Sequence, residues 1–112
     1  CLDLCASPGS KTMQCMELLT TGTIVANDIH PQRVAALKDA IGRASLPAST
    51  TSRLLLSTHD GSKFPLPLSS TLLFDKVMTD VPCSGDGTIR KDKTILPRWN
   101  HILKNTQTLT LA

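Results

Sequence analysis

One cysteine of the 112-residue chain, Cys83, stands in a setting that predicts a chemical role. It follows Asp80, Val81 and Pro82, and a serine and two glycines come shortly after it. A structural cysteine belongs in an apolar core rather than in a glycine-rich turn. A thiol and a carboxyl group three residues apart can instead provide the nucleophile and the proton-transfer group of covalent catalysis.

Methyl transfer to carbon 5 of cytosine is a reaction that needs such a pair. That carbon is not nucleophilic enough to take a methyl group directly, and addition of a thiolate at carbon 6 activates it. An acid must protonate the ring nitrogen as the adduct forms, and a base must remove the proton from carbon 5. Asp80 and Cys83 would supply a carboxyl group and a thiol, while Gly85 and Gly87 would let the backbone approach a base.

The segment CASPGSK, residues 5–11, is a second candidate site. It follows an apolar stretch and begins a helix, whose first amides favour an electron-rich group, and Gly9 allows close approach. Asp28 lies nineteen residues after Gly9, the place of the ribose-hydroxyl partner in nucleoside-binding α/β folds. The loop lacks the glycine patterns that admit a diphosphate. S-adenosylmethionine is therefore the leading ligand, and a NAD-dependent oxidoreductase is a weaker alternative.

Strand-like and helix-like stretches alternate along the chain, which predicts a parallel sheet with helices packed on its faces. Apolar residues recur at helical spacing in residues 10–19 and 30–44. We expect about four parallel strands in a partial doubly wound, Rossmann-like α/β sheet with helices on both faces. The expected strands are residues 1–6, 23–28, 53–60 and 73–82, with linker at 46–52, loop at 61–72 and a helical tail at 94–112.

An acid lies at or near the end of each expected strand. The carboxyl ends of parallel strands form one edge of the sheet, and ligands bind there in open α/β sheets. Turn-forming or helix-capping Asp residues would explain each acid singly. Four in register favour a polar ligand across the edge, with Asp60 accepting a hydrogen bond from the exocyclic amine of adenine. The four acids are Asp3, Asp28, Asp60 and Asp80.

Composition narrows the class of protein. No apolar run is long enough to span a bilayer, so no membrane association is expected. The four cysteines and three histidines are scattered, which argues against a metal site and favours reduced thiols in a nuclear, including nucleolar, or cytoplasmic protein. Arg90 and Lys91 belong to a short basic run, which is either a solvated turn or a contact to nucleic-acid phosphates.

Four stretches, in order, resemble motifs of the Sun-domain RNA (cytosine-5) methyltransferases: LDLCASPGSKT, ANDIHPQR, THDGS and DVPCSGDGTIRK. The last is most similar to the eukaryotic multisite tRNA cytosine-5 methyltransferase branch. The resemblance covers nearly the whole chain. It implies that residues 1–112 are a fragment of a single S-adenosylmethionine-dependent catalytic domain, truncated before the later strands. The implied activity is methylation of cytosine in RNA, above all tRNA, through a cysteine–cytosine adduct.

The resemblance also implies roles for individual residues. Asp80 faces the target base, and Cys83 is the family's second cysteine, which assists release of the methylated RNA. The attacking cysteine belongs to a Thr-Cys motif on the next strand, which these residues do not contain, so the fragment alone would be inactive. A non-catalytic RNA- or nucleoside-binding remnant of the fold is the alternative. The implied contacts to S-adenosylmethionine are Cys5, Ala6, Ser7, Pro8, Gly9, Ser10, Lys11, Asp28, Asp60 and Asp80.

Overall fold

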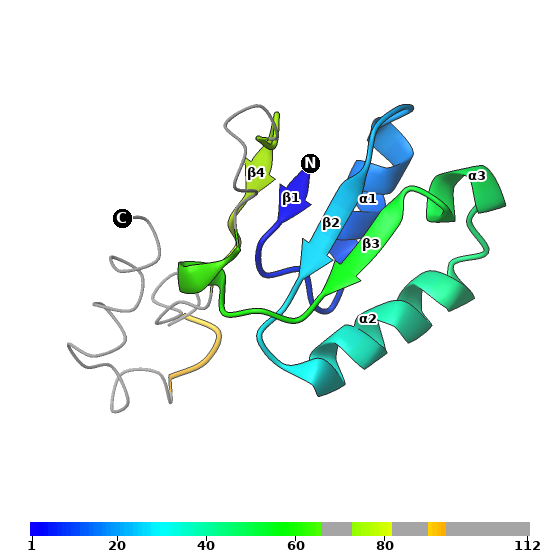
Figure 1. Ribbon diagram of the computed structural model, residues 1–112. Helices are drawn as coiled ribbons and strands as arrows, with labels where there is room; N and C mark the ends of the chain where they lie inside the picture. Colours follow the sequence, from blue (N-terminus) through cyan, green and yellow to red (C-terminus); the bar gives the residue numbers. More distant parts are fainter. Residues whose placement is uncertain (66–72, 82–89, 94–112) are drawn as a thin grey trace. The chain divides into compact units, whose positions relative to one another are not determined.

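The computed structural model describes residues 1–65, 73–81 and 90–93, which belong to two compact units, residues 1–80 and 81–112. In the first unit, four parallel strands form a single sheet in the order β3-β2-β1-β4 (Figure 1). The strands are β1 Leu2–Asp3, β2 Ile24–Asn27, β3 Leu54–Ser57 and β4 Val77–Met78. Because all four are parallel, their carboxyl ends lie at one edge of the sheet.

Helices connect the strands. They are α1 Ser10–Leu18, α2 Pro31–Arg43, the short α3 Ala48–Thr51 and the 3-10 helix η1 Gly61–Lys63. Pro31 begins α2, where its fixed φ suits the first helical turn and no intrahelical donor is lost. No helix within the described ranges is both long enough and apolar enough to cross a membrane.

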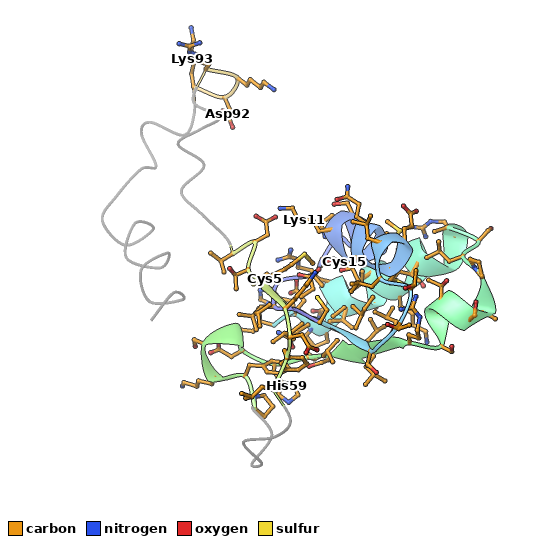
Figure 2. The ribbon with its side chains drawn as sticks, turned by 90° about the horizontal axis from the view of Figure 1, so that it is seen from above. Cys5, Lys11, Cys15, His59, Asp92 and Lys93 are labelled. Atoms are coloured by element: carbon orange, nitrogen blue, oxygen red, sulfur yellow. The ribbon has the colours of Figure 1, made fainter. Side chains whose placement is uncertain are left out.

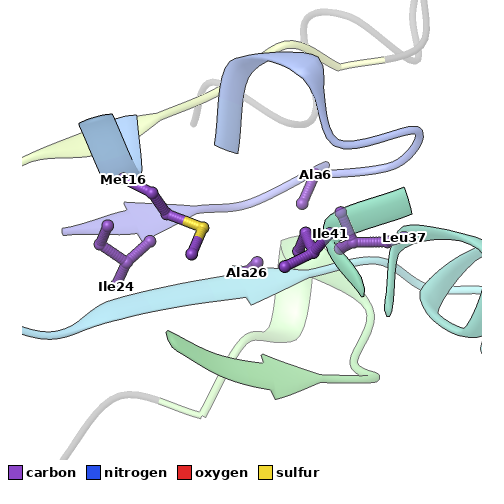
Figure 3. Close-up of a cluster of buried hydrophobic side chains, with 6 residues drawn as sticks. All are labelled: Ala6, Met16, Ile24, Ala26, Leu37 and Ile41. Carbon is purple, nitrogen blue, oxygen red and sulfur yellow. The ribbon is translucent and has the colours of Figure 1, made fainter. Parts of the chain in front are cut away.

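The core lies between the sheet and the helices α1 and α2 (Figure 3). Ile24 and Ala26 alternate along β2 and therefore point to the same face of the sheet. Met16 of α1 packs there, as do Leu37 and Ile41 of α2, which are four residues apart and share one face of that helix. Both helices thus cover the same face of the sheet. This packing holds α1 and α2 against the strands that they connect in the chain.

The predicted fold class, a partial α/β sheet of four parallel strands with helices, is confirmed. Within the described residues α1 and α2 pack on one face, so the helices expected on the second face stay a prediction. The element bounds differ from the prediction. The sheet pairing of β1 and β4 covers two residues each, because the chain leaves the ladder soon after Asp3 and Met78. The predicted linker contains α3, which begins after Pro47. The N–H groups of Thr50 and Thr51 donate to the carbonyl of Pro47. The predicted loop 61–72 begins with η1, and the predicted helical tail lies outside the described residues.

Gly9 joins the predicted ligand loop to α1, and two constraints require glycine there. Its φ is +108°, a left-handed value that L side chains rarely adopt. A Cβ atom at this position would also overlap Cδ1 of Leu37. The sequence-based interpretation assigned Gly9 to close approach of a ligand. The structure adds that the backbone conformation and the packing of α2 already exclude a side chain.

We expect Gly9→Ala to lower the free energy of unfolding by about 1–3 kcal/mol, because it combines backbone strain with a clash in the core. Gly42→Ala is the matched control, since Gly42 lies within α2 and has open space around it. That change should stabilise the protein by about 0.5–1 kcal/mol through helix propensity. Urea denaturation measures both. Equal effects of the two substitutions would contradict the assignment for Gly9.

Candidate functional site

Arg33 fixes the loop of residues 5–11 to the start of α2. Its Nη2 donates a hydrogen bond to the carbonyl of Ser7 at 2.7 Å and lies 3.4 Å from Oδ2 of Asp28. The Ser7 hydroxyl donates in return to the Arg33 carbonyl at 3.0 Å. The N–H of Ala6 also donates to the carbonyl of Asn27 at 2.7 Å. The loop predicted to contact a nucleoside is thus held beside Asp28.

Asp28 is buried, and each of its carboxylate oxygens has one contact in the local structure. Its side chain is 3% exposed, and Oδ1 accepts a hydrogen bond from the N–H of His30 at 3.1 Å. This short turn leads into α2, while Oδ2 faces Arg33. Each carboxylate oxygen has two lone pairs, so both oxygens retain capacity to accept from a ligand hydroxyl. The turn-forming role and the ligand role considered for Asp28 are therefore compatible.

Asp3 does not fit the pattern of the other acids. Its side chain is buried and faces α1, where Oδ2 accepts a hydrogen bond from the Thr12 hydroxyl at 2.6 Å. Burial raises the pKa of Asp3, and hydrogen bonds from the Thr12 side chain and the Cys5 backbone oppose that rise. Asp3 therefore anchors β1 to α1 from inside the sheet.

Lys11 and Asp80 form an ion pair between α1 and the end of β4. Lys11 is in the first turn of α1, Asp80 lies two residues beyond β4, and both side chains are more than half exposed. An exposed pair of this kind contributes little to stability. Its consequence is positional, because it places the carboxyl group that precedes Cys83 in sequence beside the loop of residues 5–11.

Asp60 lies at the end of the same edge, after β3. Its Oδ1 accepts from the N–H of Ser62 at 2.9 Å and from the Ser62 hydroxyl at 2.7 Å, which begins η1. These hydrogen bonds lower the pKa of Asp60, and the residue is exposed. Asp60 is therefore an ionised acceptor at neutral pH. Its predicted contact to adenine stays a prediction.

Three polar residues that the sequence analysis did not single out organise this edge. Thr12 donates a hydrogen bond to Asp3, and Arg33 lies against Asp28. Asn27, the last residue of β2, is fully buried, and its side chain bonds to Leu4 and His59 on the neighbouring segments. The sequence did contain one indication of this role. Asn27 ends a strand whose other residues are apolar, and a buried amide there must form hydrogen bonds to neighbouring segments.

The cysteines divide between the two parts of the chain. Cys1, Cys5 and Cys15 are free and half-buried. Burial raises the pKa of the Cys5 thiol, and the negative charges of Asp28 and Asp3 raise it further, so Cys5 stays protonated at neutral pH. Cys83 lies outside the described residues, and its role stays a prediction, as does the nuclear or cytoplasmic location.

Arg90 and Lys91 belong to the second compact unit, where both side chains are exposed. Exposure is compatible with both hypotheses for this basic run, the solvated turn and the phosphate contact. The structure therefore brings together Ser7, Lys11, Asp28 and Asp80 of the predicted site residues, through Arg33 and the Lys11–Asp80 pair. It puts Asp60 at the same edge through the parallel order of the strands.

An open parallel sheet with acids along its carboxyl edge is the architecture of a nucleoside-binding α/β domain. The family model for the 16S rRNA methyltransferase RsmB/F matches residues 1–110. The chain belongs to this RsmB/F methyltransferase family, which confirms the predicted resemblance.

The chain is also similar to individual proteins. The chain is 39% identical to the tRNA (cytosine(34)-C(5))-methyltransferase of Drosophila melanogaster, over 88% of this chain and 15% of that protein. It is 36% identical to the multisite-specific tRNA:(cytosine-C(5))-methyltransferase of Saccharomyces cerevisiae, over 88% of this chain and 16% of that protein. The crystal structure of PH0851 matches 96% of this chain and 24% of its own, with a TM-score of 0.75 and 30% identity. The chain thus spans less than a fifth of the two curated relatives' length.

The Asp3–Thr12 bond predicts a pH-dependent effect of Thr12→Val, which removes the hydroxyl but keeps the shape. Loss of a hydrogen bond to a buried carboxylate should cost about 1.5–3 kcal/mol at neutral pH. Thr12 favours the ionised form, so its loss raises the pKa of Asp3 further. The difference from the wild type should shrink as the pH falls through the raised pKa toward the ordinary 3.8, because protonated Asp3 carries no charge.

Urea denaturation at several pH values measures this effect, and Thr12→Ser, which keeps the hydroxyl, is the control. A loss of stability that is the same at neutral and acidic pH would mean that Thr12 acts only through packing.

Proposed function

We propose that the protein containing this chain is an S-adenosylmethionine-dependent RNA (cytosine-5) methyltransferase that acts on tRNA. One observation carries the proposal: within a chain of the RsmB/F family, Arg33 holds the loop of residues 5–11 against buried Asp28 at the carboxyl edge of the sheet. The names of the fly and yeast relatives both specify cytosine-C5 methylation of tRNA, which favours tRNA among RNA substrates.

The residues at this edge fit S-adenosylmethionine by their chemistry. Asp28 keeps acceptor capacity for the two ribose hydroxyls, and ionised Asp60 can accept from the adenine amine. The amides of the first turn of α1 have no side-chain cap, because Gly9 provides none, and they suit the carboxylate of the amino-acid part. When bound, S-adenosylmethionine supplies the methyl group.

The remaining steps are assigned to protein groups on the cytosine. A thiolate from a downstream Thr-Cys motif adds to carbon 6 while an acid protonates the ring nitrogen, and carbon 5 then accepts the methyl group. A base removes the proton from carbon 5, and the carbon–sulfur bond breaks to release the thiolate. Asp80, held by Lys11, faces the base, and Cys83 assists the release of the methylated RNA. Asp80 follows β4, so its carboxyl group lies at the edge proposed to bind the methyl donor.

Asp28→Asn should weaken binding of S-adenosylhomocysteine to the full-length protein by about tenfold or more. The reason is that the amide replaces one of the two acceptor oxygens by an NH2 group and removes the negative charge. The substitution keeps an oxygen for the N–H of His30, so the start of α2 should survive. Isothermal titration calorimetry measures the affinity. Asp39→Asn, a change of the same charge at an exposed position of α2, is the control and should leave the affinity unchanged.

Two results of that titration would contradict the proposal. One is a wild-type protein that binds neither S-adenosylmethionine nor its demethylated product. The other is a wild-type protein that binds NAD instead, which would favour the oxidoreductase.

Cys83→Ala should leave methyl transfer possible and trap tRNA covalently. The reason is that the thiol that assists release of the methylated RNA from the adduct is missing. Denaturing gel electrophoresis of the full-length variant with tRNA and S-adenosylmethionine detects the trapped complex, and mass spectrometry of the RNA detects 5-methylcytosine. Loss of methyl transfer with no trapped complex would make Cys83 itself the nucleophile. Cys15→Ala, a half-buried cysteine of α1, is the control and should trap nothing.

Replacement of Arg90 and Lys91 by Ala should weaken tRNA binding and lower the salt slope of log K by about 1–2, because one or two phosphate contacts disappear. The matched control replaces Lys38 and Arg43, two exposed cations of α2, and should leave the slope unchanged. Filter binding at several salt concentrations measures the slope. An identical slope in both double variants would return Arg90 and Lys91 to the solvated-turn hypothesis.

A further inference from the structure

Asn27 uses every hydrogen-bonding position of its side-chain amide. Nδ2 donates to the carbonyl of Leu4 at 3.0 Å and to the carbonyl of His59 at 2.9 Å. Oδ1 accepts from the N–H of His59 at 2.9 Å and from the Ser57 hydroxyl at 2.9 Å. Two donors and two lone pairs are the full capacity of the group. The side chain is fully buried, so Asn27 has no polar atom left for a ligand.

These bonds extend the sheet beyond its last backbone pair. The ladder between β2 and β3 ends where Asn27 pairs with Ser57. Past that point, the Asn27 amide bonds to both the N–H and the carbonyl of His59, as a neighbouring strand would. On the other side, the bond to Leu4 reaches the residue that directly follows β1. One side chain therefore joins the carboxyl ends of three adjacent strands.

The segment held in this way leads directly to Asp60. The Ser57 hydroxyl lies 2.8 Å from Nδ1 of His59 as well as bonding to Asn27, so the ring of His59 is part of the same network. When the Ser57 hydroxyl donates to Asn27, Nδ1 of His59 must carry the hydrogen in their shared bond. His59, which is labelled in Figure 2, belongs to the short segment between β3 and η1. Backbone and ring of the residue before Asp60 are thus both fixed.

We propose that Asn27 is a positioning residue that sets the place of Asp60 and thereby determines the preference of the site for an adenine base. This inference rests on the proposed function, in which Asp60 accepts from the exocyclic amine. Asn27 would act on Asp60 and the ligand indirectly, through the bonds that hold His59, since its own polar atoms all bond to protein. A purely structural Asn27 would instead affect the binding of every nucleoside equally.

The test compares two ligands of the full-length protein by calorimetry: S-adenosylhomocysteine and its 6-oxo analogue S-inosylhomocysteine, which lacks the amine. The wild type should prefer the adenosyl ligand by about tenfold, the value of one hydrogen bond to a charged acceptor. Asp60→Ala should abolish that preference. Asn27→Ala should abolish it too, because it should weaken binding of the adenosyl ligand about tenfold more than binding of the inosyl ligand. The double variant Asn27→Ala/Asp60→Ala should lose no more of the adenine preference than Asp60→Ala alone.

The outcomes separate this inference from the proposed function. If the wild type binds neither ligand, the proposed function and this inference both fail. If the wild type shows a preference that Asp60→Ala removes and Asn27→Ala keeps, only this inference fails. Equal weakening of both ligands by Asn27→Ala also overturns it, because that result assigns Asn27 a structural role alone.

A second measurement needs no variant and covers a failure of Asn27→Ala to fold. Amide hydrogen exchange of the wild type should show the His59 N–H exchanging at least about tenfold more slowly than in an unstructured peptide, because Asn27 holds it. Exchange of the His59 amide at the unstructured rate would overturn the proposal. Ser57→Ala removes the hydroxyl bonds to Asn27 and to the His59 ring but leaves both Asn27 bonds to the His59 backbone. This variant should keep the adenine preference, and loss of that preference would also count against Asn27.

Discussion

Polar side chains buried at the ends of β1 and β2 impose the constraint on which this structure depends. Taken as whole residues, Asp3, Asn27 and Asp28 are each exposed by 2% or less. Burying such groups without hydrogen bonds would cost several kcal/mol each. Within the described residues, every buried side-chain nitrogen or oxygen has a hydrogen-bond partner. Because Thr12, Arg33 and the partners of Asn27 belong to other segments than the groups they contact, meeting this requirement also fixes how the segments lie.

The consequence for function is an ordered edge built from three separate links. The Thr12 bond to Asp3 joins α1 to β1, and the Arg33 bonds join α2 to the loop that precedes α1. The Asn27 bonds join the ends of β1, β2 and the segment after β3. A ligand at this edge would meet groups that are already in place, which lowers the ordering cost of binding. The Lys11–Asp80 pair differs, since both of its side chains are exposed and accessible to a substrate.

The sequence was sufficient for the order of the four strands and of helices α1 and α2, and for the acids at the strand ends, because periodicity and strand polarity are local properties. Asp28, Asp60 and Asp80 follow three parallel strands, so one topology brings them to one edge. The reason for glycine at position 9 could not be predicted in full, since it depends on Leu37 of another helix. Arg33 and Asn27 were missed for the same reason: their partners are 26 and 32 residues away.

A crystal structure of the full-length protein with S-adenosylhomocysteine tests the central claim most directly, namely that the buried polar network forms a nucleoside site. We expect both ribose hydroxyls within about 3 Å of the Asp28 carboxylate, with the bonds from Arg33 to Ser7 and from Asn27 to His59 intact. A ligand bound elsewhere, with the Asp28 carboxylate bonded only to His30 and Arg33, would contradict the claim.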